Sequence, residues 1–243
     1  MKKLFLLFAL LLSAVQLSFA DSALTSTEFY KAYLDVPIVK AAADQPNVLS
    51  EEAKVYLFDE ANPLDVKLAL INAVGWKFEG LTAYKDYLNY CIQHFPKRKY
   101  GIAPNKRITQ QDVFKHASPE QKAVLVYLSA MSNYFNTAAM SKMVRMAMTT
   151  PRTDKQSFML AIGLVKAQIA LDNDWAEVYP IVYDCVNKPR IKDMRPEAID
   201  LVMEYINEYK KYTHKSSSQP VNLPPFPTKN LPRNSTSAPS DSG

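Results

Sequence analysis

Positive charge is concentrated in the segment from Pro96 to Arg107. This segment contains five cations and no anion within twelve residues, and its two prolines and one glycine predict a loop. A loop that gathers cations beside an aromatic ring is suited to hold an anionic partner: an acidic protein face, a phosphate-rich envelope surface or an acidic glycan. The alternative is a solvated connection that has no partner. The candidate binding residues are Lys97, Arg98, Lys99, Tyr100, Lys106 and Arg107.

Cys91 and Cys185 are the two cysteines of the chain, and an oxidising compartment would allow them to form a disulfide. That bond would close a long loop and stabilise the fold by roughly 4–5 kcal/mol in the entropic account. The alternative is two buried thiols that lie far apart. The spacing of Cys91 and His94 also places a thiol and an imidazole on one helical face, as a nucleophile–base pair requires. A structural cysteine beside a surface histidine explains the same residues.

The sequence contains no zinc-helix motif, no serine-nucleophile motif and no glycine-rich loop. The three histidines are far apart, and no serine lies in a Gly-x-Ser-x-Gly or Ser-x-x-Lys motif. Five glycines are too few for dinucleotide-binding or phosphate-binding loops. We therefore expect no cofactor and no metal site, and we favour a protein without enzymatic activity. An exported hydrolase is the alternative, because two opposed carboxylates among 24 acidic residues would leave no sequence signal.

Methionines are clustered in one part of the chain, several of them at a spacing of three. Thioethers are soft ligands that suit Cu(I), so copper handling is a third hypothesis for an exported protein. The same spacing builds an apolar helical stripe, and the apolar residues between these methionines favour packing in the core. The methionines concerned are Met131, Met140, Met143, Met146, Met148 and Met159.

The first 20 residues have the features of a cleavable secretory signal. Lys2 and Lys3 precede an apolar stretch, and Ser18-Phe19-Ala20 offers small residues at both recognition positions of a cleavage site. The alternative is an uncleaved anchor, but the uncharged run 4–20 has 17 residues, at the short end for a transmembrane helix. We expect cleavage after Ala20 and a soluble periplasmic or secreted protein without a further transmembrane segment.

Hydrophobic residues follow the period of an α-helix almost everywhere between Thr25 and Lys215. The stretch 65–78 is too apolar for a surface helix and is expected at the centre, whereas 196–215 carries one apolar stripe. The uncharged but polar stretch 123–141 predicts a buried helical hairpin. We predict an all-α domain over residues 21–215, with about nine helices in antiparallel hairpins, arranged as a helical repeat or an irregular bundle.

Helix start signals recur along this domain. Five residues with a capping oxygen stand three positions ahead of a carboxylate or an amide, as in a capping box. Pro63 and Pro119 are expected at first helical positions, whereas Pro37 and Pro180 predict a kink or a short break. The five capping pairs are Thr25 with Glu28, Thr109 with Asp112, Ser118 with Gln121, Thr153 with Gln156, and Asp174 with Glu177.

The composition changes after Lys215. Residues 216–243 hold six prolines and seven serines, and few large apolar side chains. A segment of this composition cannot offset its ordering entropy, so we expect a disordered or polyproline-like tail. The tail is either a bare C-terminus or a spacer that carries a proline-rich peptide ligand.

Three segments resemble known α-helical hairpin repeats. Residues 62–75 resemble the turn and second helix of a HEAT repeat, and Trp175–Val182 resembles the first helix of such a repeat with its proline. The stretch from Gly75 to Pro96 is similar to a shortened tetratricopeptide unit, through Gly75, Phe78, Gly80, Tyr84, Tyr87 and Pro96. The resemblance implies a helical-repeat surface that binds another macromolecule. It assigns no functional residue.

Together these features predict an exported, non-enzymatic protein that presents a helical surface to another protein or to an envelope component. The basic loop is expected to aid this binding. The formal charge of the chain is +5, and removal of Lys2 and Lys3 with the leader leaves +3. This bias is too small to predict nucleic acid as a partner. The alternatives are a hydrolase that acts on cell-envelope polymer and a copper-handling protein.

Overall fold

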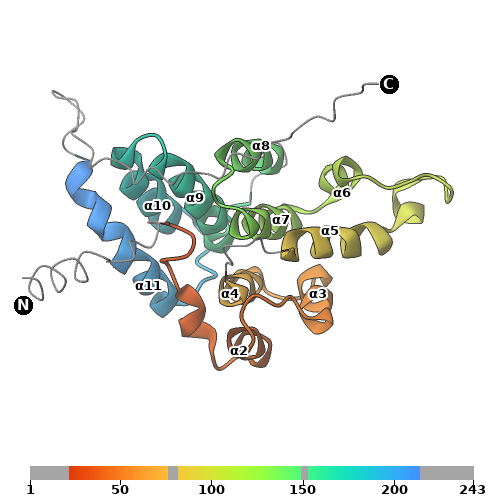
Figure 1. The fold of residues 1–243 in the computed structure, drawn as a ribbon, viewed down its shortest axis with the longest axis horizontal. Coiled ribbons are helices and arrows are strands. Elements are labelled where there is room, and N and C mark those ends of the chain that lie inside the picture. Colours follow the sequence, from red (N-terminus) through yellow and green to blue (C-terminus); the bar gives the residue numbers. More distant parts are fainter. Residues whose placement is uncertain (1–21, 76–81, 149–152, 214–243) are drawn as a thin grey trace, which may run out of the picture.

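The computed structural model describes residues 22–75, 82–148 and 153–213, which form ten α-helices and four short 3-10 helices (Figure 1). This confirms the predicted all-α fold. The predicted leader, 1–20, and the predicted tail, 216–243, lie outside the described residues. The elements are η1 (Phe29–Tyr33), α2 (Pro37–Asp44), α3 (Glu51–Phe58), α4 (Leu64–Val74), α5 (Ala83–Gln93), η2 (Lys97–Tyr100), α6 (Gln110–His116), α7 (Pro119–Ser132), α8 (Thr137–Met148), α9 (Gln156–Leu171), η3 (Trp175–Glu177), α10 (Val178–Asn187), α11 (Pro196–Ile206) and η4 (Asn207–Tyr212).

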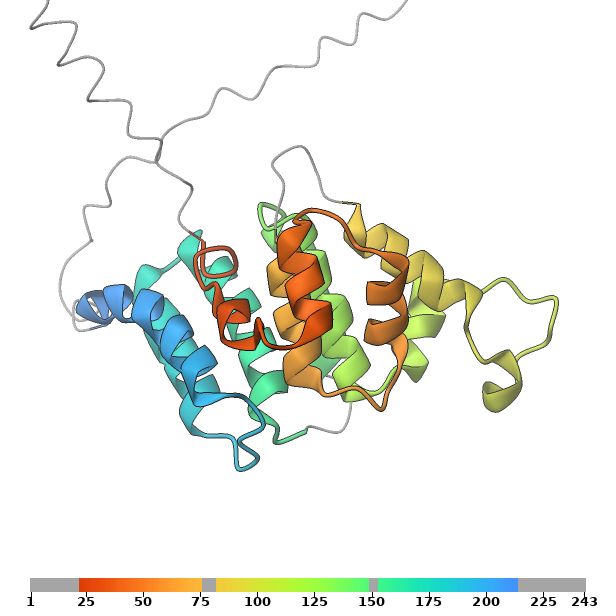
Figure 2. The ribbon, with the colours of Figure 1, turned by 90° about the horizontal axis from the view of Figure 1, so that it is seen from below.

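Three helices form the centre of the bundle: α4, α7 and α9. Helix α4 packs on α7, α7 packs on α9, and α4 also contacts α9 (Figure 2). A helix that is covered on most of its surface must be apolar on most of its sides. Ten of the eleven residues of α4 and 13 of the 16 residues of α9 are accordingly buried. The central position expected for 65–78 is thus confirmed for its described part.

The remaining helices cover this centre. Helices α2 and α3 pack on α4, and α8 and α10 pack on α9. The predicted buried hairpin is formed by α7 and α8, which follow each other in the chain and pack together. The stripe predicted for 196–215 is carried by α11, which continues into the 3-10 helix η4.

The predicted helix starts have mixed outcomes. Thr109 and Asp112 form a reciprocal capping box, Ser118 caps α7, and Asp174 caps η3. The prediction for Thr153 was wrong, because α9 begins after Lys155. The first turn of α9 is instead capped by Asp193, a residue far away in the sequence. Asp193 accepts hydrogen bonds from the backbone N–H (2.8 Å) and the hydroxyl (2.6 Å) of Ser157. The prediction for Thr25 was also wrong, because the first helical turn begins at Phe29.

The prolines also differ in their outcomes. Pro119 is the first residue of α7 as predicted, whereas Pro63 precedes α4, which begins at Leu64. Pro37 is the first residue of α2, and Pro180 is the third residue of α10, directly after η3. Both therefore lie in the first turn of a helix, where the missing N–H of proline costs little. The helix boundaries lie just before them, at the start of α2 and between η3 and α10.

The first and last parts of the domain pack together, since η1 lies against α11. The guanidinium of Arg195 donates to the carbonyl oxygen of Ala32 (2.8 Å) and pairs with Asp35. The backbone N–H of Arg195 donates to the hydroxyl of Tyr33 (3.2 Å), over whose ring the guanidinium lies. In a helical repeat each unit contacts only its neighbours, so this closure makes the domain an irregular bundle.

Candidate functional site

The basic segment forms a loop that projects from the outer end of α5, away from the centre of the bundle (Figures 1 and 2). We call residues 96–107 the basic finger. Helix α5 buries Ala83, Tyr87 and Cys91, which recur every four residues on the side that faces the bundle. Gln121 of α7 donates to the hydroxyl of Tyr87 and lies 3.8 Å from the sulfur of Cys91. This packing fixes the direction of α5 and therefore the place where the finger begins.

The finger has a defined shape of its own. It begins with η2, which the sequence did not predict, and Gly101 then takes a left-handed conformation with φ of 63°. The backbone N–H of Ile102 donates to the carbonyl oxygen of Lys97 (2.9 Å), and the ammonium of Lys97 donates to the carbonyl oxygen of Pro104 (2.6 Å). Lys97 thus ties the two sides of the finger together.

An aromatic cluster attaches the finger to α6. The ring centroids of Tyr100 and His116 are 4.2 Å apart, and Phe95 lies 5.4 Å from Tyr100 and 5.8 Å from His116. The hydroxyl of Tyr100 also donates to the carbonyl oxygen of His116 (3.3 Å). Tyr100, singled out as a binding residue, is half-buried here, so it positions the finger. Phe95 and His116 were missed by the sequence analysis, since neither belongs to a charged or repeated pattern.

A second attachment joins the finger to the start of α6. The ammonium of Lys106 lies 3.3 Å from a carboxylate oxygen of Asp112. Hydrogen bonds from the side chain and backbone of Thr109, together with Lys106, lower the pKa of Asp112 to about 2. Asp112 is therefore charged throughout the physiological pH range and holds Lys106 in place.

Three cations of the finger remain available for a partner: Arg98, Lys99 and Arg107. All three are exposed, and none forms an ion pair with a carboxylate of the residues that the structure describes. The ammonium of Lys99 lies 5.4 Å from the ring centroid of Tyr100. The six predicted residues thus divide into three that bind other parts of the protein, Lys97, Tyr100 and Lys106, and three exposed cations without an ion pair to the described residues.

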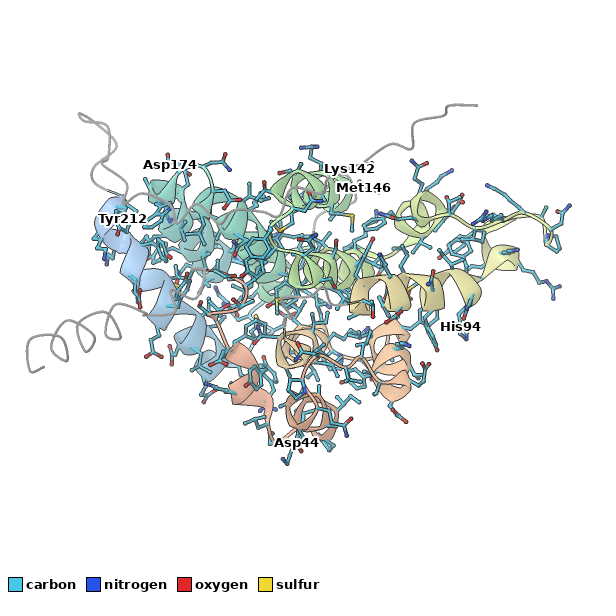
Figure 3. The ribbon with its side chains drawn as sticks, viewed as in Figure 1. Asp44, His94, Lys142, Met146, Asp174 and Tyr212 are labelled. Carbon is cyan, nitrogen blue, oxygen red and sulfur yellow. The ribbon has the colours of Figure 1, made fainter. Side chains whose placement is uncertain are left out.

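The two cysteines are separate buried thiols, on α5 and α10. Burial raises the pKa of Cys91 to about 12 and that of Cys185 to about 11, so both are neutral. The sulfur of Cys185 packs so closely on α9 that a Cβ at Gly163 would lie 2.6 Å from it. His94 is exposed at the outer end of α5 and stacks on Tyr90 (Figure 3). The structure does not bring its imidazole together with the buried thiol of Cys91.

The methionine cluster belongs to the hydrophobic core. Its sulfurs are not gathered at the surface, where copper capture would need them. No group of three or more His, Cys, Asp or Glu side chains in the described ranges is arranged to hold a metal ion. Met131, Met140 and Met143 are buried, and Met146, Met148 and Met159 pack against the core.

Two carboxylates come together near Tyr33, namely Asp65 and Asp193. Burial raises the pKa of Asp65, and the charge of Asp193 raises it further. Asp193 accepts both hydrogen bonds from Ser157. Neither carboxylate lines any of three pockets in the described part of the chain, which lie between α2 and α3, between α6 and α8, and beside the end of α4. These pockets have volumes of about 150, 250 and 230 Å³, below the range of ordinary ligand sites. Asp65 lies in the first turn of α4, and Asp193 caps the start of α9 from the loop before α11.

The helices in the described ranges are too short or too polar for any of them to cross a membrane.

The HEAT-like segments 62–75 and Trp175–Val182 form α4 with its preceding turn, and η3 with the start of α10. Of the tetratricopeptide-like residues, Phe78 and Gly80 lie outside the described part. Comparisons of the chain with protein-family models, with curated proteins and with solved structures found no match.

Proposed function

We propose that this chain is an exported, non-enzymatic protein that binds the acidic face of another protein through its basic finger. One observation carries the proposal: Arg98, Lys99 and Arg107 are exposed on a projecting loop whose other charged side chains hold its shape. A solvated connection without a partner would need neither this concentration of cations nor these internal contacts.

The defined shape of the finger favours a protein over a lipid surface. Anionic lipids attract cations wherever they lie, at about 1 kcal/mol per Lys or Arg, and require no particular loop conformation. A protein face requires matched positions, and a loop that is already ordered loses less conformational entropy when it binds. The contacts of Lys97, Tyr100 and Lys106 supply that order.

Retention on immobilised poly-L-glutamate tests whether the finger is the anion-binding surface. The chain without its leader should elute late in a gradient from about 0.1 M to about 1 M salt, where the screening length falls from roughly 10 Å to 3 Å. The variant R98E/K99E/R107E should elute near the start of the gradient. Retention on vesicles of phosphatidylglycerol with little retention on poly-L-glutamate would instead assign the finger to lipid and contradict the proposal.

The matched control is K85E/K142E/K166E, which makes the same change in net charge. These three lysines are exposed on α5, α8 and α9 and form no ion pair with the described residues. We expect this variant to elute at a clearly higher salt concentration than the finger variant. Equal elution of the two variants would show that net charge acts without the finger, and the proposal would fail.

A further inference from the structure

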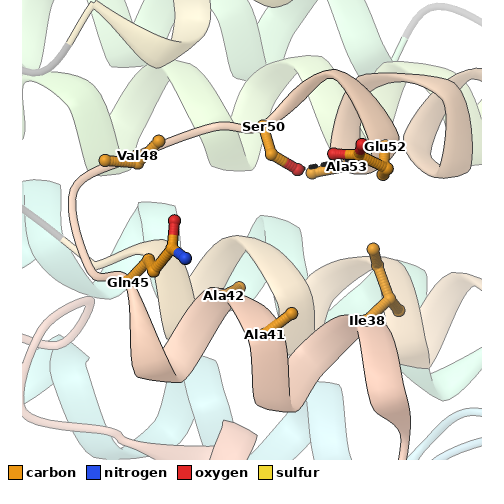
Figure 4. A pocket seen from close by; sticks show the side chains of 8 residues that line it. All are labelled: Ile38, Ala41, Ala42, Gln45, Val48, Ser50, Glu52 and Ala53. Carbon is orange, nitrogen blue, oxygen red and sulfur yellow. Dashed lines mark hydrogen bonds between the residues drawn. The ribbon is translucent and has the colours of Figure 1, made fainter.

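A small pocket with a mixed apolar and polar lining lies between α2 and α3 (Figure 4). Its volume is about 150 Å³, which suits one or two small side chains of a partner better than a complete small-molecule ligand. Val48 at its edge is 53 % exposed, so the apolar surface continues outside the pocket. The lining residues are Ile38, Ala41, Ala42, Gln45, Val48, Ser50, Glu52 and Ala53.

The chain segment that contains α2 and α3 is acidic. Residues 37–60 hold five exposed carboxylates against two lysines, a net charge of −3. The lysines pair with Asp44, at the outer edge of α2, and with Glu51 (Figure 3). Glu52, Asp59 and Glu60 form no ion pair with a cation of the described residues. Among the residues that line the pocket, Glu52 carries the negative charge, beside apolar side chains and the polar side chains of Gln45 and Ser50.

The basic finger has the complementary composition. Its net charge is +5, and it also presents small side chains, Ala103 and Pro104, both exposed between its two groups of cations. A tip of small side chains flanked by cations is complementary to a small pocket that has Glu52 in its lining and belongs to a segment of net negative charge.

We infer that the basic finger of one copy of this chain docks into the α2–α3 pocket of a second copy. The inference rests on the proposed function, of which it names the partner. The finger is directed away from the bundle in both views, so it does not fill the pocket of its own molecule (Figures 1 and 2). The cations approach Glu52 and its acidic neighbours, and the tip enters between Ala41 and Ala53.

This contact is of the heterologous kind, because a finger meets a pocket and not another finger. Each docked copy keeps one free finger or one free pocket, so association continues into a closed ring or an open chain. The contact is small and largely electrostatic, and we expect it to be weak and to depend strongly on salt.

Sedimentation velocity of residues 21–243 tests this inference. The average mass should rise with protein concentration at about 0.1 M salt and fall to that of the monomer at about 1 M salt. Ala41 is exposed and lines the pocket, so Ala41→Phe should fill the pocket and weaken association at least about tenfold. The control Ala138→Phe places the same ring at an exposed position of α8 and should leave association unchanged. A chain that stays monomeric at low salt, or equal effects of the two phenylalanines, would overturn the inference.

A charge-exchange experiment separates this inference from the proposed function. R98E/K99E/R107E has an acidic finger, and D44K/E52K/E60K reverses the net charge of the segment 37–60 from −3 to +3. Each variant alone should be monomeric at about 0.1 M salt, whereas an equimolar mixture should associate, because each finger then meets an opposite charge on the other variant. A mixture that stays monomeric refutes docking between copies. The finger-dependent retention of the wild-type chain on poly-L-glutamate would persist in that case, and the proposed function would stand.

Discussion

Replacement of Asn72 by alanine is expected to destabilise the fold by about 2–4 kcal/mol, because it leaves buried polar groups without partners. Asn72 lies on the central helix α4 and is 5 % exposed. Its side-chain oxygen accepts a hydrogen bond from the backbone N–H of Tyr30 (3.1 Å). Its amide nitrogen donates to the hydroxyl of Tyr127 (3.1 Å) and to the carbonyl oxygen of Leu24 (3.4 Å). One side chain thus joins the N-terminal segment, α4 and α7.

Urea denaturation followed by circular dichroism measures this effect, with Tyr127→Phe as the matched control. The phenylalanine variant removes one of the three hydrogen bonds and keeps the aromatic ring in the core, so we expect a loss of only about 1 kcal/mol. If Asn72→Ala were no more destabilising than Tyr127→Phe, the hydrogen bonds to Leu24 and Tyr30 would contribute nothing. That result would contradict the account of this junction.

Replacement of Asp193 by alanine is expected to cost about 2–4 kcal/mol. Loss of a helix cap costs about 1–2 kcal/mol, and a buried donor left without an acceptor adds about 1–3 kcal/mol. Asp193 accepts from both the backbone N–H and the hydroxyl of Ser157, a residue that is completely buried. No local residue caps α9 in its place, since the side chain of Lys155 makes no capping hydrogen bond.

Asp154→Ala is the control for Asp193→Ala, because Asp154 also joins the start of α9 to the loop before α11. Asp154 pairs with Arg190, whose side chain is 88 % exposed, and an exposed pair contributes only about 0–1 kcal/mol. The urea concentration at the midpoint of unfolding should therefore be clearly lower for Asp193→Ala than for Asp154→Ala. Equal midpoints would mean that Asp193 acts as a surface ion pair and not as the cap of a central helix.

The fold class and the central elements could be predicted from the sequence, because the signals that define them are local. The apolar density of 65–78 placed α4 at the centre, and the capping box of Thr109 and Asp112 marked the start of α6. The cap of α9 could not be predicted in this way, since Asp193 stands 36 positions after Ser157. The packing of η1 on α11 is equally remote in the sequence. This packing shows that the domain is an irregular bundle and not a helical repeat, the two arrangements that the sequence left open.

The candidate site likewise combines features that the local sequence predicts with features that depend on contacts remote in the sequence. The cations of the finger could be identified from composition alone, but not which of them are available to a partner. That distinction depends on the carbonyl oxygen of Pro104 and on the carboxylate of Asp112, which occupy Lys97 and Lys106. The role of Tyr100 depends on its contact with His116, sixteen positions later in the chain. Of the five cations, these contacts leave three, Arg98, Lys99 and Arg107, exposed and without an ion pair to the described residues.

Affinity capture from the cell envelope tests the central claim most directly. The tagged chain, the finger variant R98E/K99E/R107E and the control K85E/K142E/K166E would be cross-linked in parallel, and the captured proteins identified by mass spectrometry. The account predicts a protein with an acidic face, which can be a second copy of this chain. It should be captured in stoichiometric amounts by the wild type and the control, with cross-links to the finger, and lost from the finger variant. Capture of the same protein by all three, or by none, would contradict it.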